Sequence, residues 1–280
     1  MDSPAIVHQA MAENATEEDV MNKTKIQWVK NPDGTPGYTW NPITGCLNGC
    51  SYCYARKLAN GRLKQRYLAN KNLARWHEPT LGEYGFSALS RALSDPFYPR
   101  FWPGRMSRIS QGTPSTTFKP KGIFVCDMGE LFGDWVPKEW QEEVFQVIRG
   151  CKWHRFYLLT KQPQNLIKFT PFPDNCWVGV TATNDKMAWD AIYHLAQVKA
   201  KVKYISFEPL LGQMSNETLY AMRELDWVII GCQTPPSAET MPKLEWVEEI
   251  VNAADRAGTP VFIKPPLSDI MGYHREEMPV

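Results

Sequence analysis

The 280-residue chain lacks any apolar run that approaches the roughly 18 residues of a membrane-spanning helix. Its first 22 residues are polar and acidic, and they lack the basic start and the apolar core of a secretory signal. We therefore expect no membrane partner and a cytoplasmic location. We also expect a disordered or poorly ordered N-terminal tail over residues 1–22.

The sequence also lacks the cysteine pattern of a disulfide-stabilised protein. Four of its seven cysteines are scattered singly, at Cys126, Cys151, Cys176 and Cys232. This distribution suits a reducing cytoplasm. With 43% apolar residues, a chain of this length can bury one large core, and one α/β barrel or two small domains would both fit.

Short apolar runs alternate with amphipathic stretches after residue 120. The runs are rich in Val, Ile, Phe and Tyr without polar alternation, as expected for strands that are buried on both faces. They are Gly122–Asp127, Arg155–Thr160, Cys176–Thr181, Lys203–Phe207, Asp226–Gly231 and Pro260–Lys264. An extended segment around residues 38–43 is the predicted first strand.

Apolar residues at helical spacing lie between these runs. The stripes are Trp140, Val144, Val147 and Ile148 behind Pro137; Trp189, Ile192, Tyr193 and Ala196; and Leu244, Val247, Val251 and Ala254 before a stop at Gly258. Strand–helix alternation of this length predicts an α/β fold, a partial (β/α) barrel of about six to seven parallel strands. We expect one barrel domain over residues 23–270 and a C-terminal tail over 271–280. The first helix, over 54–63, is followed by a long aromatic and basic insertion at about 64–120.

Cys46, Cys50 and Cys53 follow the predicted first strand with the spacing C-x3-C-x2-C. Three cysteines can bind three irons of a [4Fe–4S] cubane and leave the fourth iron without a protein ligand, whereas electron-carrying clusters normally take four thiolates. Such a loop leaves a coordination position open to an outside molecule. The alternative is a zinc site that a distant histidine completes, since structural zinc takes four ligands. The nearest downstream histidine is His77.

This spacing, with Tyr52 directly before the last cysteine, resembles the cluster loop of the radical S-adenosylmethionine (radical SAM) superfamily. Further segments resemble an uncharacterised branch of that superfamily, a domain of unknown function that includes many phage-encoded proteins. The segments are Ile26–Trp28, Thr39–Cys46, Leu159–Lys161, Trp177–Val180, Ser206–Gly212 and Asp226–Gly231. The resemblance runs from about Thr24 to Pro266.

The resemblance implies an enzyme with a [4Fe–4S] cluster and S-adenosylmethionine as cofactors. Such an enzyme cleaves S-adenosylmethionine reductively to a 5′-deoxyadenosyl radical, which abstracts a hydrogen atom from a substrate. An electron donor such as flavodoxin or ferredoxin is implied as a partner. We predict that the aromatic Tyr52 contacts the cofactor.

Polar residues that follow the predicted strands are the candidate cofactor ligands. Gly129 and Glu130 match the last two positions of the Gly-Gly-Glu with which superfamily members often contact the methionine amino group; alternatively, Glu130 caps a turn. Thr181 and Asn184 are candidates for the ribose or the carboxylate, although Asn184 also suits a helix cap. Glu208 ends its strand before a proline and is predicted to bind cofactor or substrate.

Three further residues at strand ends have two interpretations each. Lys161 and Lys264 can meet a carboxylate or phosphate, or form salt bridges at the barrel rim. Cys232 stands where the resembled family has a second glycine, and it is a candidate hydrogen-atom donor to a product radical. The alternative for Cys232 is a small half-buried core residue.

Charge is distributed unevenly along the chain. Residues 54–121 carry 13 Lys and Arg residues against 3 Asp and Glu residues, a balance of +10, whereas the rest balances at −9. Basic side chains interleaved with aromatic ones predict a nucleic acid or nucleotide substrate that the enzyme modifies or repairs. The alternatives are that the aromatics form a small core of their own, that the substrate is a peptide or small metabolite, or that the chain is a non-catalytic, zinc-stabilised nucleic-acid-binding module.

Overall fold

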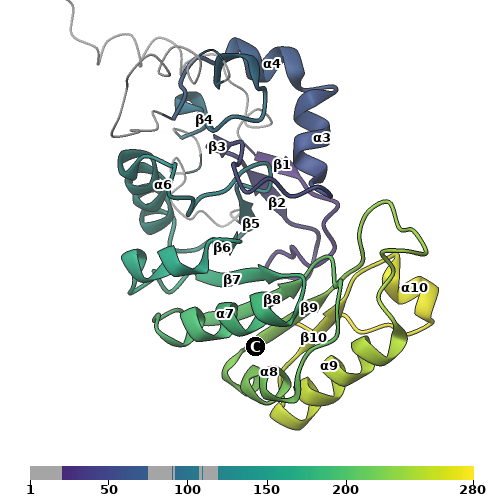
Figure 1. The fold of residues 1–280 in the computed structure, drawn as a ribbon. Coiled ribbons are helices and arrows are strands. Elements are labelled where there is room, and N and C mark those ends of the chain that lie inside the picture. Colours follow the sequence, from purple (N-terminus) through teal and green to yellow (C-terminus); the bar gives the residue numbers. More distant parts are fainter. Residues whose placement is uncertain (1–20, 75–89, 91, 107–108, 110–118) are drawn as a thin grey trace, which may run out of the picture.

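The computed structural model describes residues 21–74, 90, 92–106, 109 and 119–280. These residues form a mixed α/β fold around a mostly parallel eight-stranded sheet, consistent with the predicted partial barrel (Figure 1). In spatial order its strands are β1 (Met21–Lys23), β2 (Tyr38–Trp40), β5 (Gly122–Val125), β6 (Arg155–Thr160), β7 (Cys176–Ala182), β8 (Val202–Phe207), β9 (Trp227–Ile230) and β10 (Val261–Ile263). Only β1 runs antiparallel to its neighbour. β3 (Ile43–Thr44) and β4 (Arg100–Phe101) form a separate antiparallel pair.

Helices connect the parallel strands, as the alternating sequence pattern predicts. The α-helices are α3 (Tyr54–Asn60), α4 (Lys64–Ala69), α6 (Lys138–Gly150), α7 (Asp185–Ala196), α8 (Asn216–Ala221), α9 (Leu244–Ala257) and α10 (Leu267–Met271); the 3₁₀ helices are η1 (Pro103–Arg105), η2 (Pro163–Phe169) and η3 (Met222–Glu224). In the described part of the chain, no helix has the length and apolar character needed to cross a membrane.

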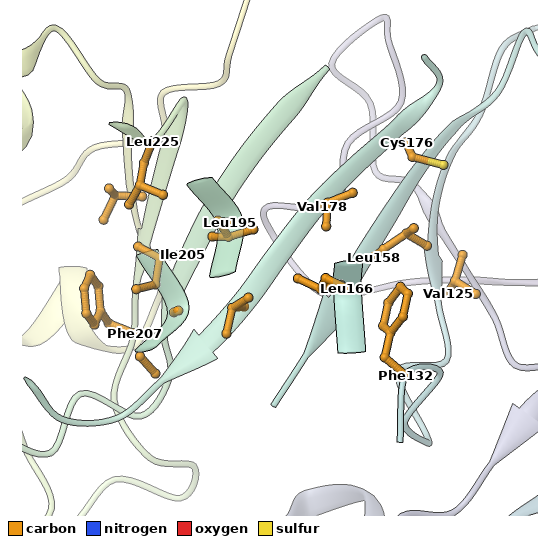
Figure 2. Close-up of a cluster of buried hydrophobic side chains, with 14 of the residues drawn as sticks. Val125, Phe132, Leu158, Leu166, Cys176, Val178, Leu195, Ile205, Phe207 and Leu225 are labelled. Carbon is orange, nitrogen blue, oxygen red and sulfur yellow. The ribbon is translucent and has the colours of Figure 1, made fainter. Parts of the chain in front are cut away.

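One face of the sheet packs against the helices. Val125, Leu158, Val178 and Ile205 come from four successive strands and belong to one buried cluster with residues of α6, α7, η2 and α9. Figure 2 shows these side chains beside one another, with Leu166 and Leu195 among them. Because β-strand side chains alternate between faces, the residues between these positions must point to the other side of the sheet.

The opposite face of the sheet carries a buried aromatic cluster around Trp28. The Trp28 ring centroid lies 5.0 Å from that of Phe124, 5.6 Å from Tyr157, 6.1 Å from Tyr204 and 6.0 Å from Trp227. Tyr157 and Tyr204 are each the third residue of a six-residue strand. The same alternation places the side chains two and four residues after them, at the ends of β6 and β8, on this aromatic face. The fold therefore puts apolar residues at one end of this face and polar residues at the other.

The structure corrects the predicted face of α7. Trp189 and Tyr193 are 49% and 61% exposed, while Ala188, Ala191 and Leu195 are buried against the sheet. Of the predicted stripe, Ile192 is buried as expected, whereas Ala196 is exposed like Trp189 and Tyr193. Helical periodicity allowed two neighbouring faces, and the face with small residues packs against the strands.

Two predicted boundaries also differ from the structure. The first helix ends at Asn60 instead of residue 63, since Gly61 caps it and α4 then begins within the predicted insertion. At the C-terminal end, residues 275–277 fold back along β10, where Ile263 N donates to Arg275 O and Glu277 N donates to Val261 O. The predicted N-terminal tail lies outside the described residues except for Met21 and Asn22, which belong to β1.

We predict that Gly179→Ala destabilises the fold by about 1–3 kcal/mol, because it overpacks the core. A Cβ at Gly179 in β7 would lie 2.3 Å from the ring of Tyr204, which is buried on the neighbouring strand. The control is Gly150→Ala at the end of α6, where an added Cβ meets no atom within 4 Å. Urea unfolding of both variants tests this prediction, and equal midpoints would contradict it.

Candidate cluster and cofactor site

The cysteine loop joins β3 to α3 and is held against the segment that follows β5. Gly45 N donates to Met128 O at 2.9 Å, and Glu130 N donates to Gly45 O at 3.2 Å. Gly45 has a φ of +89°, and a Cβ there would lie 2.6 Å from the carbonyl oxygen of Phe97. Only glycine fits this approach without strain. The backbone thereby fixes where Cys46 begins the loop.

The three cysteines of the loop are free thiols at partly exposed positions. Cys46 Sγ accepts a hydrogen bond from Asn48 N at 3.4 Å. Cys53 caps α3, with its Sγ accepting from Arg56 N at 3.3 Å. Burial raises the pKa of the Cys46 thiol to about 12, and the charges of Glu130, Cys50 and Cys53 also raise it. The positive charge of a bound metal would offset this repulsion and lower the pKa of the thiols, so that they bind the metal as thiolates.

Three thiols on one short loop are the donor set that an iron–sulfur cluster takes. In the described ranges, no three His, Cys, Asp or Glu side chains lie close enough to ligate a single metal ion. A cubane does not require the three sulfur atoms to meet at one metal ion, because each thiolate binds a separate iron atom. The residues present therefore fit the cluster by their chemistry and by their place at the carboxyl ends of the strands.

Glu130 is a buried carboxylate that faces three donors. Its Oε1 accepts from Phe132 N at 3.0 Å and from the Thr160 hydroxyl at 2.7 Å, and its Oε2 accepts from Lys161 N at 3.0 Å. Burial raises the pKa of Glu130, while these hydrogen bonds oppose that effect. A carboxylate offers about four lone-pair positions, so about one remains for a further donor.

Gly129 has a packing role in the structure. A Cβ on this residue would lie 2.9 Å from the carbonyl oxygen of Ile43 and 3.2 Å from that of Gly45. The glycine thus lets the segment after β5 approach the start of the cysteine loop. Its predicted contact with the cofactor stays a prediction.

Lys161 connects the cysteine loop to the strand ends. Its Nζ lies 5.7 Å from the centroid of the Tyr52 ring. Burial lowers the pKa of Lys161, whereas the nearby charges of Cys50, Glu130, Glu208 and Cys46 raise it. Among the described residues, no carboxylate comes within salt-bridge distance of this ammonium group. Lys161 is therefore a half-buried cation near Cys46, Cys50, Glu130 and Glu208.

Glu208 and Lys264 form a second polar group on the same face of the sheet, whereas the nearby Cys232 belongs to the buried cluster on the helix-covered face. Lys264 Nζ forms a salt bridge with Glu208 Oε1, which is the rim salt bridge that the sequence allowed for Lys264. Cys232 is buried, and burial raises the pKa of its thiol, with Glu208 raising and Lys264 lowering it. The Cys232 thiol is therefore protonated at neutral pH. Its role as a hydrogen-atom donor stays a prediction.

The remaining predicted cofactor residues lie on or after β7. Thr181 is buried on the strand and pairs in register with Ser206, whose hydroxyl has no hydrogen-bond partner within the described part of the chain. Asn184 Oδ1 accepts from Met187 N at 3.0 Å and so caps α7, as the alternative interpretation predicted. The Tyr52 side chain interacts with Cys50 and with Thr183, one residue before Asn184. These contacts bring the cysteine loop to the end of β7.

Sequence analysis missed an acidic residue beside the loop. Asp127 Oδ1 accepts from Asn41 Nδ2 at 2.5 Å, and the hydroxyl of Tyr54 donates to Asp127 O at 2.7 Å. Burial raises the pKa of Asp127. Tyr54 directly follows Cys53 and is 46% exposed. The signal was present in the sequence, because Asp127 is the last residue of a predicted strand and strand ends carry the candidate site.

The aromatic residues of the 54–121 segment are used mainly in packing. Tyr67 and Phe97 are buried with Met128 in a small cluster, and Phe101 joins the main core. The structure thus favours the interpretation that these aromatics build a core of their own. Trp102 remains partly exposed. Four other aromatics of the segment and the nearby histidine lie outside the described residues: Trp76, His77, Tyr84, Phe86 and Phe118.

The chain belongs to a family described as "Protein of unknown function (DUF5131)", whose sequence model matches residues 23–266. This match confirms the predicted resemblance to a domain of unknown function over about the same range. The association with phages stays a prediction. No curated protein matches the chain.

Two solved structures are similar in fold to the chain, at 9% sequence identity. One is a spore photoproduct lyase variant with bound AdoMet and dinucleoside spore photoproduct, with a TM-score of 0.47 over 94% of this chain and 85% of that one. The other is spore photoproduct lyase complexed with dinucleoside spore photoproduct, with a TM-score of 0.46 over 94% of this chain and 86% of that one. Likenesses this remote do not assign an activity.

We predict that Glu130→Gln lowers the free energy of unfolding by about 1–3 kcal/mol, because one buried donor loses its acceptor. All three partners of the Glu130 carboxylate are donors, so a side-chain amide nitrogen would face an N–H or O–H group. Glu139→Gln, at an exposed position of α6, is the control. Urea denaturation measures both variants, and equal stability would show that Glu130 is not held by these three donors.

Proposed function

We propose that the chain is a radical SAM enzyme in which Cys46, Cys50 and Cys53 bind a four-iron cubane. The observation that carries the proposal is the placement of a loop with three free thiols next to the buried Glu130 and the half-buried Lys161, at the carboxyl ends of the strands. Barrel enzymes place their chemistry at this end. When bound, the cluster and S-adenosylmethionine supply a 5′-deoxyadenosyl radical after reduction by an external donor such as flavodoxin or ferredoxin.

The chain's own charged residues suit the two ends of a bound amino acid. The lone-pair position left on Glu130 can accept a hydrogen bond from the methionine ammonium group, and Lys161 can pair with the methionine carboxylate. Both interactions are charge-assisted and form in a buried setting, where they are stronger than in water. In this proposal Tyr52, Thr181 and Asn184 line the nucleoside end.

Glu208 and Cys232 complete the proposed site on the substrate side. The salt bridge to Lys264 keeps the Glu208 side chain on the face of the sheet that carries Lys161. Cys232 lies near both members of this pair and keeps its proton. A protonated thiol can donate a hydrogen atom to a product radical, whereas a thiolate cannot.

We propose a nucleic acid or nucleotide as the substrate class, which the enzyme modifies or repairs. Residues 54–74 contain six Lys and Arg residues and no Asp or Glu, and five of the six are exposed on or beside α3 and α4. The exposed ones are Lys57, Arg62, Lys64, Arg66 and Lys71. None of them forms a salt bridge with another described residue. Unpaired cations on one surface attract the phosphates of a polynucleotide.

We predict that Cys46→Ser, Cys50→Ser and Cys53→Ser each abolish cluster binding. The wild-type protein, reconstituted without oxygen, should be brown and contain about four irons per chain. It should yield 5′-deoxyadenosine when dithionite and S-adenosylmethionine are added. Iron content and visible absorbance measure the cluster independently of activity.

The control for the cysteine variants is Cys151→Ser. Cys151 Sγ donates to Ile109 O at 3.1 Å within the core, and a serine hydroxyl can keep this hydrogen bond. The control should retain the iron of the wild type. A colourless wild-type protein that contains one zinc ion would refute the proposal, and would favour a zinc-stabilised module.

We predict that Lys161→Met weakens S-adenosylmethionine binding to the reconstituted protein about tenfold, because a charge-assisted hydrogen bond is lost. The iron content should not change, since Lys161 binds no iron in this proposal. Lys201→Met, at an exposed position after α7, is the control. Equilibrium dialysis measures the dissociation constants. If Lys161→Met and Lys201→Met bind alike, Lys161 does not hold the cofactor.

A further inference from the structure

A cavity lies beside α4 and η1, in the basic segment of the chain. None of the residues of the proposed active site lines it. Its volume is about 510 Å³. It is lined by Arg66, Ala69, Asn70, Asn72, Trp102, Pro103, Gly104 and Arg105. These residues come from the end of α4, the loop that follows it, and η1. None of the lining residues is acidic.

Two guanidinium groups gather around one indole ring at this cavity. The guanidinium carbon of Arg105 lies 4.1 Å from the Trp102 ring centroid, and that of Arg66 lies 5.8 Å away. Burial and the charge of Arg66 lower the pKa of Arg105 to about 10. Among the described residues neither arginine forms a salt bridge. Two cations therefore lie close together without a salt-bridge partner, and the nearby charge of Asp127 offsets only part of the lowering of the Arg105 pKa. An anion would stabilise this arrangement.

The architecture of the cavity holds these groups in place. Trp102 Nε1 donates to the Thr44 hydroxyl at 2.8 Å, and Arg105 Nη1 donates to Asn41 O at 2.6 Å. One edge of the guanidinium group of Arg105 is thus used for positioning. Arg66 donates to none of the described residues, and it is exposed at the mouth of the cavity. Arginine is suited to this task because its planar fork matches the oxygens of a phosphate.

A short chain of contacts joins the cavity to the cysteine loop. Arg105 contacts the backbone of Asn41, whose side chain donates to Asp127. Asp127 O in turn accepts from the hydroxyl of Tyr54, which directly follows Cys53. A ligand anchored in the cavity would therefore be connected to the cluster loop through Asn41, Asp127 and Tyr54.

We propose that this cavity binds a backbone phosphate of a single-stranded polynucleotide and so positions the strand for the reaction at the cluster. The inference rests on the proposed nucleic-acid substrate. Arg66 and Arg105 would contact the phosphate oxygens, and the side-chain amide of Asn72 would add a donor. The stacking face of Trp102 is covered by arginine, so the site reads a phosphate and not a base.

Two variants of the full-length chain test this site, each with a matched control. Arg66→Gln removes a pocket cation, while Arg62→Gln removes an equally exposed cation that does not line the cavity. Gly104→Glu places a carboxylate inside the cavity, at a position where an added Cβ meets no atom within 4 Å. Gly150→Glu makes the same charge change at an exposed glycine outside the cavity, where an added Cβ also meets no atom within 4 Å.

Binding is measured as fluorescence anisotropy of a labelled dodecamer over a salt series. Separate arms use single-stranded DNA, single-stranded RNA and duplex DNA. For the single strands, Arg66→Gln should weaken binding about tenfold, as expected for a lost charge-assisted hydrogen bond, and reduce the slope of log K against log salt by about 0.7. Gly104→Glu should weaken binding at least as much. The controls should keep the wild-type slope.

Equal losses of affinity in Arg66→Gln and Arg62→Gln would overturn the proposal. Wild-type binding by Gly104→Glu, or tighter binding of duplex DNA than of single strands, would also overturn it. Formation of 5′-deoxyadenosine by the reconstituted Arg66→Gln variant without nucleic acid separates this outcome from a failure of the proposed function. If that product forms while the variants bind like their controls, the phosphate site is wrong and the radical SAM activity stands. If no variant or wild-type protein forms it while the binding differences persist, the site stands and the activity is wrong.

Discussion

The close pairing of Gly45 with the segment after β5 is the constraint on which the site depends. Gly45 hydrogen-bonds to residues 128 and 130, and its positive φ turns the chain into the cysteine loop. Gly129 completes the approach, because a Cβ there would meet the backbone of the loop. Two glycines that follow separate strands thus hold the start of the cysteine loop beside the Glu130 segment. A larger residue at either position would push the two segments apart.

The sheet face that carries the site is divided by strand alternation. The aromatic cluster around Trp28 fills one end of this face. The polar groups at the other end therefore lie next to a packed core and not next to an open channel. Two residues after Leu159, and four residues after Tyr204, the same face presents Lys161 and Glu208. Burial makes each charge costly unless it meets a partner. Glu208 pairs with Lys264, whereas Lys161 has no salt bridge with a described carboxylate. In our proposal the ammonium group of Lys161 therefore binds the carboxylate of the cofactor's amino-acid end.

The strands and the cysteine loop could be predicted from the sequence because their signals are local. β6 matches the predicted run residue for residue, and Gly258 ends α9 in the left-handed conformation that a glycine stop requires. The three donors to Glu130 could not be predicted, since Lys161 lies 31 residues away and meets it only through strand pairing. Asp127 was missed for a similar reason: its partner Asn41 is 86 residues distant. The sequence could not show whether the aromatic residues of the basic segment form a small core or a stacking surface, because both have the same composition.

The central claim is that one iron of a cubane bound by Cys46, Cys50 and Cys53 has no protein ligand and accepts a small molecule. Electron paramagnetic resonance of the reduced, reconstituted protein with S-adenosylmethionine labelled at its amino nitrogen and carboxylate oxygens tests this claim most directly. The account predicts a spectrum that changes on addition of S-adenosylmethionine and shows hyperfine coupling to the labels. A spectrum that does not change when S-adenosylmethionine is added, from a cluster whose fourth iron has a ligand from this chain, would contradict the claim.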